Sequence, residues 1–121
     1  MSEWVVKKGN TAIQTIPITD ENGDAVKDMG DATAIKFQVK EGKRDETAKI
    51  AKTKDDGIEV LTGDDLGKLK ITLKPADNNI DVKSYFMGLQ IEWSADKQYE
   101  VDITVDGKET DVFRIEQDVI Q

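Results

Sequence analysis

The stretch Tyr85-Phe86-Met87-Gly88-Leu89-Gln90-Ile91-Glu92-Trp93 decides the fold of this chain. Every second residue in it is large and apolar, and from Gln90 onward the residues between them are polar. A period of two is typical of a strand with one buried and one solvated face. The following segment repeats the alternation with Tyr99, Val101, Ile103 and Val105, so we predict a hairpin whose shared apolar face is the largest in the chain.

Shorter segments with alternating or β-branched residues lie on both sides of this hairpin, with turn signals such as Asn22-Gly23 between them. Pro17 cannot donate to a ladder, which predicts an edge strand there, and the strand around Trp4 is the second predicted edge. One short helical turn is expected near residues 75–80, because Pro75 suits a first helical position. The pattern as a whole predicts an all-β chain: a single domain over residues 1–121, folded as an immunoglobulin-like antiparallel β-sandwich of about eight short strands.

Composition excludes several classes of function. The net charge of −8 argues against a nucleic-acid surface, which needs clustered basic residues. No apolar run approaches the length of a membrane span, so we predict no membrane partner. The start Met1-Ser2-Glu3-Trp4 lacks the basic and apolar regions of a signal peptide, which predicts a protein made in the cytoplasm of its host without one.

The residues that carry most catalytic chemistry are missing. The chain has no histidine and no cysteine, and it contains neither a nucleophile elbow nor a glycine-rich phosphate loop. We therefore predict no catalytic residue, no cofactor and no metal site, and we do not expect an enzyme. The spacing Asp20-x-Asn22-x-Asp24 resembles the start of a calcium loop, but Ala25 stands where glycine is required. Turn formation is the favoured role of these oxygens, and a bound cation is the alternative.

Four apolar residues are candidates for contact with another protein. Phe86 interrupts the apolar alternation and is expected on the outer face of its strand, unless a loop packs over it. Trp4, Val119 and Ile120 lie near the termini. For Trp4, as for most of the aromatic residues, a place in the core is the favoured alternative to a contact role. Tyr85 has another expected role, because a tyrosine at the start of a late sandwich strand often hydrogen-bonds to the preceding corner.

The order of features along nearly the whole chain resembles a known family. The segments that carry the resemblance are residues 5–11, 20–26, 30–39, 56–58, 67–73, 85–91 and 113–115. They resemble the immunoglobulin-like domain at the N-terminus of phage baseplate upper proteins and of related tail and prophage proteins. Family members of the baseplate type usually continue into further domains, whereas this sequence stops at Gln121, which also allows a small stand-alone virion protein.

The resemblance implies a non-enzymatic structural module of a bacteriophage or prophage virion, in the tail or baseplate. It implies docking onto other virion proteins or onto copies of the chain itself, including a homo-oligomer, and a final location in the virion. The alternative is a carbohydrate- or surface-binding immunoglobulin-like module of a bacterial protein. That alternative needs an exposed aromatic platform or a calcium site at the loop ends.

Overall fold

The structure is a computed structural model that describes residues 3–20, 22–105 and 108–117. This part of the chain is mostly β-structure, as predicted, and its helical segments are two single 3-10 turns, η1 (Met29–Asp31) and η2 (Gly63–Asp65). No helix among these residues could cross a membrane. The strands are β1 (Trp4–Lys7), β2 (Ala12–Pro17), β3 (Ala34–Lys40), β4 (Ile50–Lys54), β5 (Gly57–Val60), β6 (Lys68–Leu73), β7 (Ser84–Ser94), β8 (Lys97–Val101), β9 (Thr104–Val105), β10 (Lys108–Glu109) and β11 (Val112–Glu116).

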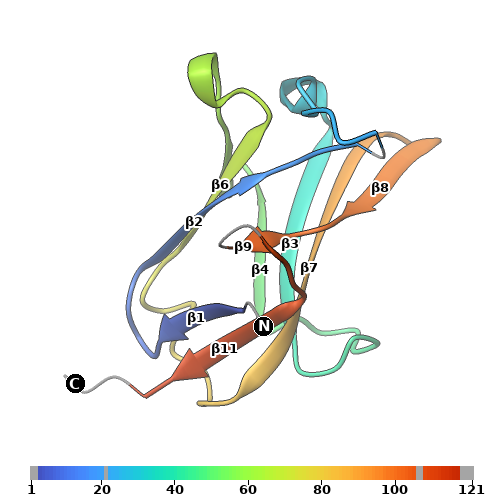
Figure 1. Cartoon of the computed structure of the whole chain (residues 1–121). Helices are drawn as coiled ribbons and strands as arrows, with labels where there is room; N and C mark the ends of the chain where they lie inside the picture. The colour runs from blue at the N-terminus through green and yellow to red at the C-terminus, as the bar shows by residue number, and fades with distance from the viewer. Residues whose placement is uncertain (1–2, 21, 106–107, 118–121) are drawn as a thin grey trace.

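Nine of the described strands form one sheet in the order β1-β11-β7-β3-β4-β5-β6-β2, and β8 pairs with β7 beside this path. The sheet curls until its two ends, β1 and β2, lie on the same side of the molecule, which gives a nearly closed barrel (Figure 1). The predicted edge strands are therefore edges. The separate β9–β10 pair crosses this side and approaches β2 near its middle.

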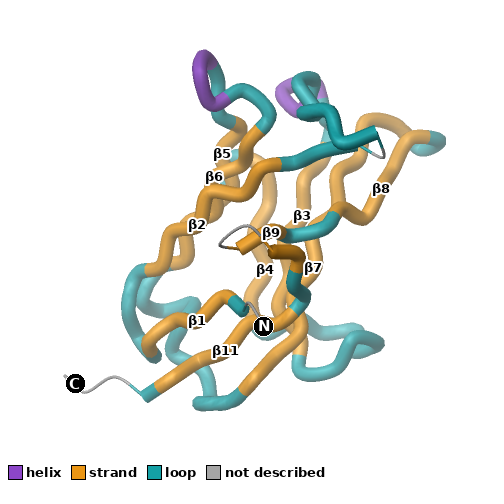
Figure 2. The backbone as a smooth tube through the Cα atoms, in the orientation of Figure 1, coloured by secondary structure: helices purple, strands orange, loops and turns teal. Residues whose placement is uncertain are grey.

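Two details of the predicted fold need correction. The β1–β11 and β4–β5 pairs are parallel, so the sheet is not antiparallel throughout. The second pair arises where Asp55 (φ 66°) and Gly57 (φ 97°) adopt positive φ and bend the chain tightly. Near residues 75–80, where a helical turn was predicted, the chain makes a hydrogen-bonded turn that is not a helix. The two 3-10 turns, η1 and η2, lie elsewhere, at the same end of the barrel (Figure 2).

The alternation in β7 builds the centre of the core. Tyr85, Met87, Leu89 and Ile91 are buried, as predicted, and β7 pairs with β3 along seven residues. Side chains from most other strands join them in one cluster. Its members are Trp4, Val6, Ile16, Ile18, Met29, Ala32, Ile35, Phe37, Val39, Ile50, Ile58, Leu69, Ile71, Leu73, Tyr85, Met87, Leu89, Ile91, Ile103, Val105, Phe113 and Ile115.

Polar groups tie the turn after β6 to its surroundings. Asp77 accepts a hydrogen bond from Lys74 N–H (2.8 Å) and a charged one from Lys52 Nζ (2.8 Å). Burial opposes ionisation of Asp77, but these hydrogen bonds and the charges of both lysines outweigh it and lower the pKa of the carboxyl. The fully buried Asn78 donates from Nδ2 to Asn10 O (2.6 Å), which fastens the β1–β2 turn to this corner.

Candidate functional site

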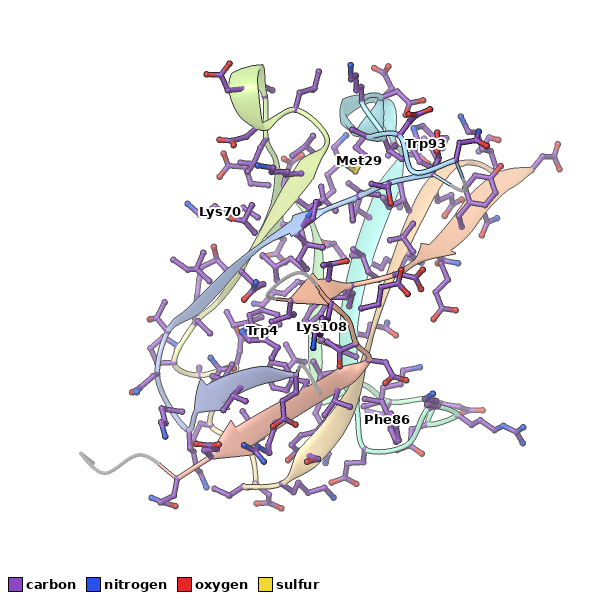
Figure 3. The ribbon with its side chains drawn as sticks, in the orientation of Figure 1. Trp4, Met29, Lys70, Phe86, Trp93 and Lys108 are labelled. Carbon is purple, nitrogen blue, oxygen red and sulfur yellow. The ribbon has the colours of Figure 1, made fainter. Side chains whose placement is uncertain are left out.

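Phe86 lies on the outer face of β7, as its place in the alternation predicts, and is 37 % exposed (Figure 3). The Lys43 ammonium stands 5.1 Å from the centre of the ring, within cation–π range, and 2.7 Å from the Asp111 carboxylate. The hydrogen bond from Lys43 lowers the pKa of Asp111, because it favours the ionised carboxylate. A loop therefore covers part of the ring and leaves the rest open to a partner.

Beside Phe86, the outer face of the sheet is hollowed where β7 carries Gly88. The hollow has a volume of ≈ 610 Å³, and Gln38, Gln90 and Glu100 help to line it. Gly88 does not adopt a positive φ, and a Cβ built on it would meet nothing closer than Glu100 Oε1 at 3.8 Å. The isolated fold therefore does not require a glycine here. A glycine inside a strand often marks a position that another backbone or a ligand approaches closely.

Trp4 does not lie at the surface. It is only 4 % exposed and packs in the core, with its ring centre 5.7 Å from that of Phe37 and 5.3 Å from that of Phe113. Its place near the N-terminus suggested exposure, but the parallel pairing of β1 with β11 turns this side chain inward. A partner that reaches β1 would meet its backbone and Val5, and not the indole.

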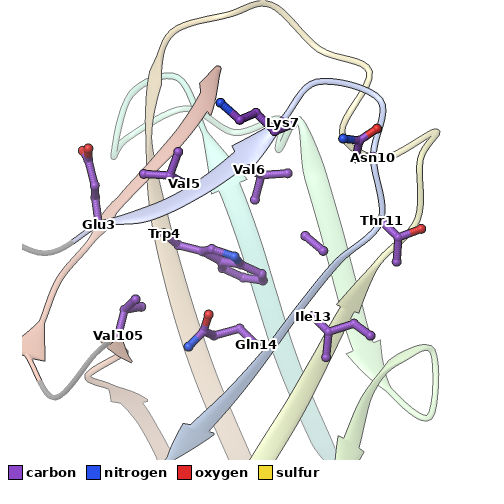
Figure 4. A pocket seen from close by; sticks show the side chains of 11 residues that line it. Glu3, Trp4, Val5, Val6, Lys7, Asn10, Thr11, Ile13, Gln14 and Val105 are labelled. Atoms are coloured by element: carbon purple, nitrogen blue, oxygen red, sulfur yellow. The ribbon is translucent and has the colours of Figure 1, made fainter. Parts of the chain in front are cut away.

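The two ends of the sheet face each other across a groove of ≈ 490 Å³ (Figure 4). Exposed Val5 on β1 and exposed Ile13 on β2 flank it. Ile18 N–H donates to Gly67 O on the β6 side (2.9 Å), and alternate residues of a strand point their backbone groups to opposite edges. Ile13 and Pro17 therefore direct their backbone groups away from β6. The nitrogen of Pro17 lies on the free edge of β2, as its inability to donate a hydrogen bond predicted.

Val119 and Ile120, the remaining predicted contact residues, lie outside the described residues. Of the two candidates that the structure describes, Phe86 lies on the outer face of the sheet and Trp4 in the core, and β11 separates their strands.

A third cleft, of ≈ 870 Å³, is larger than these two and lies between β8 and the segment that follows β2; the sequence did not predict it. Tyr99 and Trp93 form its aromatic wall, with their ring centres 6.2 Å apart in an edge-to-face arrangement. Lys97 lies over the indole at 4.7 Å, and Trp93 Nε1 donates to Asp28 O (3.0 Å). Asp20, Asp102 and other acids line the remainder, so the cleft combines an aromatic wall with acidic residues.

The alternation predicted that Tyr99 is buried in the shared face of the hairpin, and its burial is the part of this prediction that is wrong. It stands opposite Ile91 and shares its face, but Ile91 is fully buried whereas Tyr99 is 55 % exposed. The register shifts between Glu92 and Ser94, a β-bulge that re-aims side chains around Trp93. The sequence holds one local indication that Tyr99 is exposed. Residues 94–98 carry no large apolar side chain that could cover its ring.

The acids at the turns serve the backbone. Asp20 Oδ1 accepts hydrogen bonds from the N–H groups of Asn22 (2.9 Å) and Asp24 (3.1 Å), as the turn interpretation predicts. Within residues 3–20, 22–105 and 108–117, no three His, Cys, Asp or Glu side chains gather in a way that could hold a metal ion.

No protein-family model matches this chain, and no curated protein is similar to it.

Proposed function

We propose that this chain is a non-enzymatic structural module of a bacteriophage or prophage virion, in the tail or baseplate, that docks onto other virion proteins or copies of itself. The observation that carries the proposal is the incomplete closure of the sheet. Its ends, β1 and β2, lack a second neighbouring strand among the described residues, and the groove between them is flanked by exposed Val5 and Ile13. Free strand edges beside apolar side chains are templates for adding a strand from another chain.

We also propose that the all-β fold is an immunoglobulin-like sandwich. Immunoglobulin domains have two sheets, whose strands are named by letters. The order β5-β6-β2 corresponds to strands D, E and B of one sheet, and the order β4-β3-β7-β11 corresponds to strands C′, C, F and G of the other. The short β4–β5 pair joins the two sets of strands. Tyr85 Oη donates to Asp81 O (2.7 Å) just before β7, where an immunoglobulin domain carries its tyrosine corner. Both features support the resemblance to the baseplate domain.

The test is to find the protein in particles. Antibodies raised against the purified chain are applied to phage particles induced from the source strain and banded on a density gradient. We expect co-migration with intact particles in immunoblots, and gold label at the tail or baseplate in electron micrographs. Particles that form without the protein, while the cells still express it, would refute the proposal.

The second candidate, a carbohydrate- or surface-binding module, is favoured by the aromatic cleft alone. Exposed Tyr99 beside Trp93 is a surface on which a sugar ring can stack, and the carboxylates nearby can accept its hydroxyl hydrogen bonds. A Trp4→Phe variant leaves Trp93 as the sole tryptophan and hence a reporter for titrations with neutral and acidic oligosaccharides and with calcium chloride. A saturable change in its fluorescence supports this candidate, and an unchanged spectrum removes it.

A further inference from the structure

β8 is an exposed strand edge of the described fold. It pairs only with β7 in that part of the chain, and four of its five residues are exposed. The two sheet ends differ from it, because β1 and β2 face each other and β9 approaches β2. A strand with a single neighbour and two solvated faces is a template for pairing with another chain.

The backbone directions in β7 establish which groups of β8 are free. Glu92 O accepts from Thr33 N–H on the β3 side (2.8 Å), whereas Met87 N–H donates to Asp111 O on the opposite side (2.8 Å). Because neighbouring residues of a strand direct their backbone groups to opposite edges, even-numbered residues of β7 face β3. The odd-numbered residues face β11 and β8.

The register then fixes the orientation of β8. Leu89 pairs with Val101 and Ile91 with Tyr99, so Val101 and Tyr99 direct their backbone groups toward β7. Glu100 lies between Tyr99 and Val101, and Gln98 precedes Tyr99. Gln98 and Glu100 therefore direct their N–H and C=O groups to the free edge. The edge therefore presents two donors and two acceptors, to which no described residue hydrogen-bonds.

We propose that a second copy of this chain covers this edge, with β8 pairing antiparallel to its counterpart about a two-fold axis at Tyr99. In this register Gln98 lies opposite Glu100 of the second copy, and each such pair exchanges two backbone hydrogen bonds. The two Tyr99 side chains then meet at the non-hydrogen-bonded position, where side chains lie closest. The inference rests on the proposed docking function, since it names one partner for it.

The side chains of β8 are complementary to themselves in this register. Lys97 lies opposite Val101 of the second copy and Gln98 opposite Glu100, so no like charges face each other directly. A pairing centred on Glu100 would place two carboxylates opposite each other. The interface is small, so we expect a weak dimer, with a dissociation constant on the order of 0.1–1 mM.

The experiment is sedimentation equilibrium of the purified chain from about 10 μM to 1 mM, with amide NMR spectra over the same range. We expect reversible dimerisation with shifts concentrated at Gln98 and Glu100. Tyr99→Lys, which places two ammonium groups at the axis, should weaken the dimer about tenfold or more. Val82→Lys is the matched control: Val82 lies outside β8 and the β1–β2 groove, it is 47 % exposed against 55 % for Tyr99, and the charge change is identical, yet the dimer should persist.

Glu100→Pro gives a second variant. Its missing N–H faces the free edge and not β7, so the fold should tolerate the proline while the dimer is lost. A chain that stays monomeric at about 1 mM overturns the inference, as does equal weakening by Val82→Lys and Tyr99→Lys. Such a result leaves the proposed virion role intact, since that role is tested on particles.

Discussion

Replacing Gly88 by alanine should stabilise this protein, whereas most substitutions at the centre of a sheet destabilise. Gly88 lies between buried Met87 and Leu89 in β7, and a Cβ added there meets only Glu100 Oε1, at an ordinary contact distance of 3.8 Å. Alanine restricts the unfolded chain more than glycine does, without strain in the folded one. We expect the free energy of unfolding to rise by about 0.5–1 kcal/mol.

Gly67→Ala is the matched control, with the opposite expected sign. Gly67 has a φ of +95°, and an added Cβ would lie 2.9 Å from the Cβ of Ala25. The backbone conformation alone costs an alanine about 1–2 kcal/mol, and the close contact adds to that cost. Urea unfolding followed by tryptophan fluorescence measures both variants. A loss of stability in Gly88→Ala, or none in Gly67→Ala, would refute this reasoning about local backbone geometry.

Three further substitutions test the core and its polar supports, each by urea unfolding. Tyr85→Phe should lower the free energy of unfolding by about 1 kcal/mol, because the Asp81 carbonyl loses its hydrogen bond from Tyr85 Oη; an unchanged midpoint would make the corner energetically irrelevant. Trp4→Ala should cost about 3–5 kcal/mol, since it empties the space beside Phe37 and Phe113; a cost below 1 kcal/mol would place the indole outside the core. Asp77→Asn should cost about 1 kcal/mol at pH 7 by removing the charge that faces Lys52. Because the folded pKa of Asp77 lies below its unfolded value, this contribution is present above about pH 4 and is lost as the pH falls through the folded pKa, so the difference in stability between wild type and variant should shrink as the pH is lowered below about 4.

Much of the fold could be predicted because a period of two is a local property. The alternation from Tyr85 to Ile91 identifies the central strand and its buried face, and Pro17 identifies an edge, since each signal depends only on neighbouring residues. Parallel pairs could not be predicted this way. Whether β1 runs along β11 depends on contacts between residues more than 100 positions apart, such as Trp4 and Phe113.

The candidate site was less predictable, because exposure depends on what covers a face. Phe86 was assigned to the outer face from alternation alone, and the structure agrees. Trp4 occupies the core, which was the favoured alternative to its contact role, whereas Tyr99 was wrongly expected to be buried. The barrel closes over Trp4 despite its place near a terminus, while Tyr99 packs against Trp93 and stays 55 % exposed despite its position opposite buried Ile91.

The free edge and the aromatic cleft have one cause, which is the length of β7. β11 pairs with β7 only over Ser84–Phe86, and β8 pairs with it from Leu89 to Ser94, on the same edge. Between them the chain leaves the sheet through β9 and β10, so no strand of the described residues lies beyond β8 on this edge. A central strand longer than its last neighbour therefore creates both the unpaired backbone at Gln98 and Glu100 and the exposed ring of Tyr99. If β11 were long enough to pair with all of β7, β8 could not occupy this edge, and both candidate binding features would disappear together.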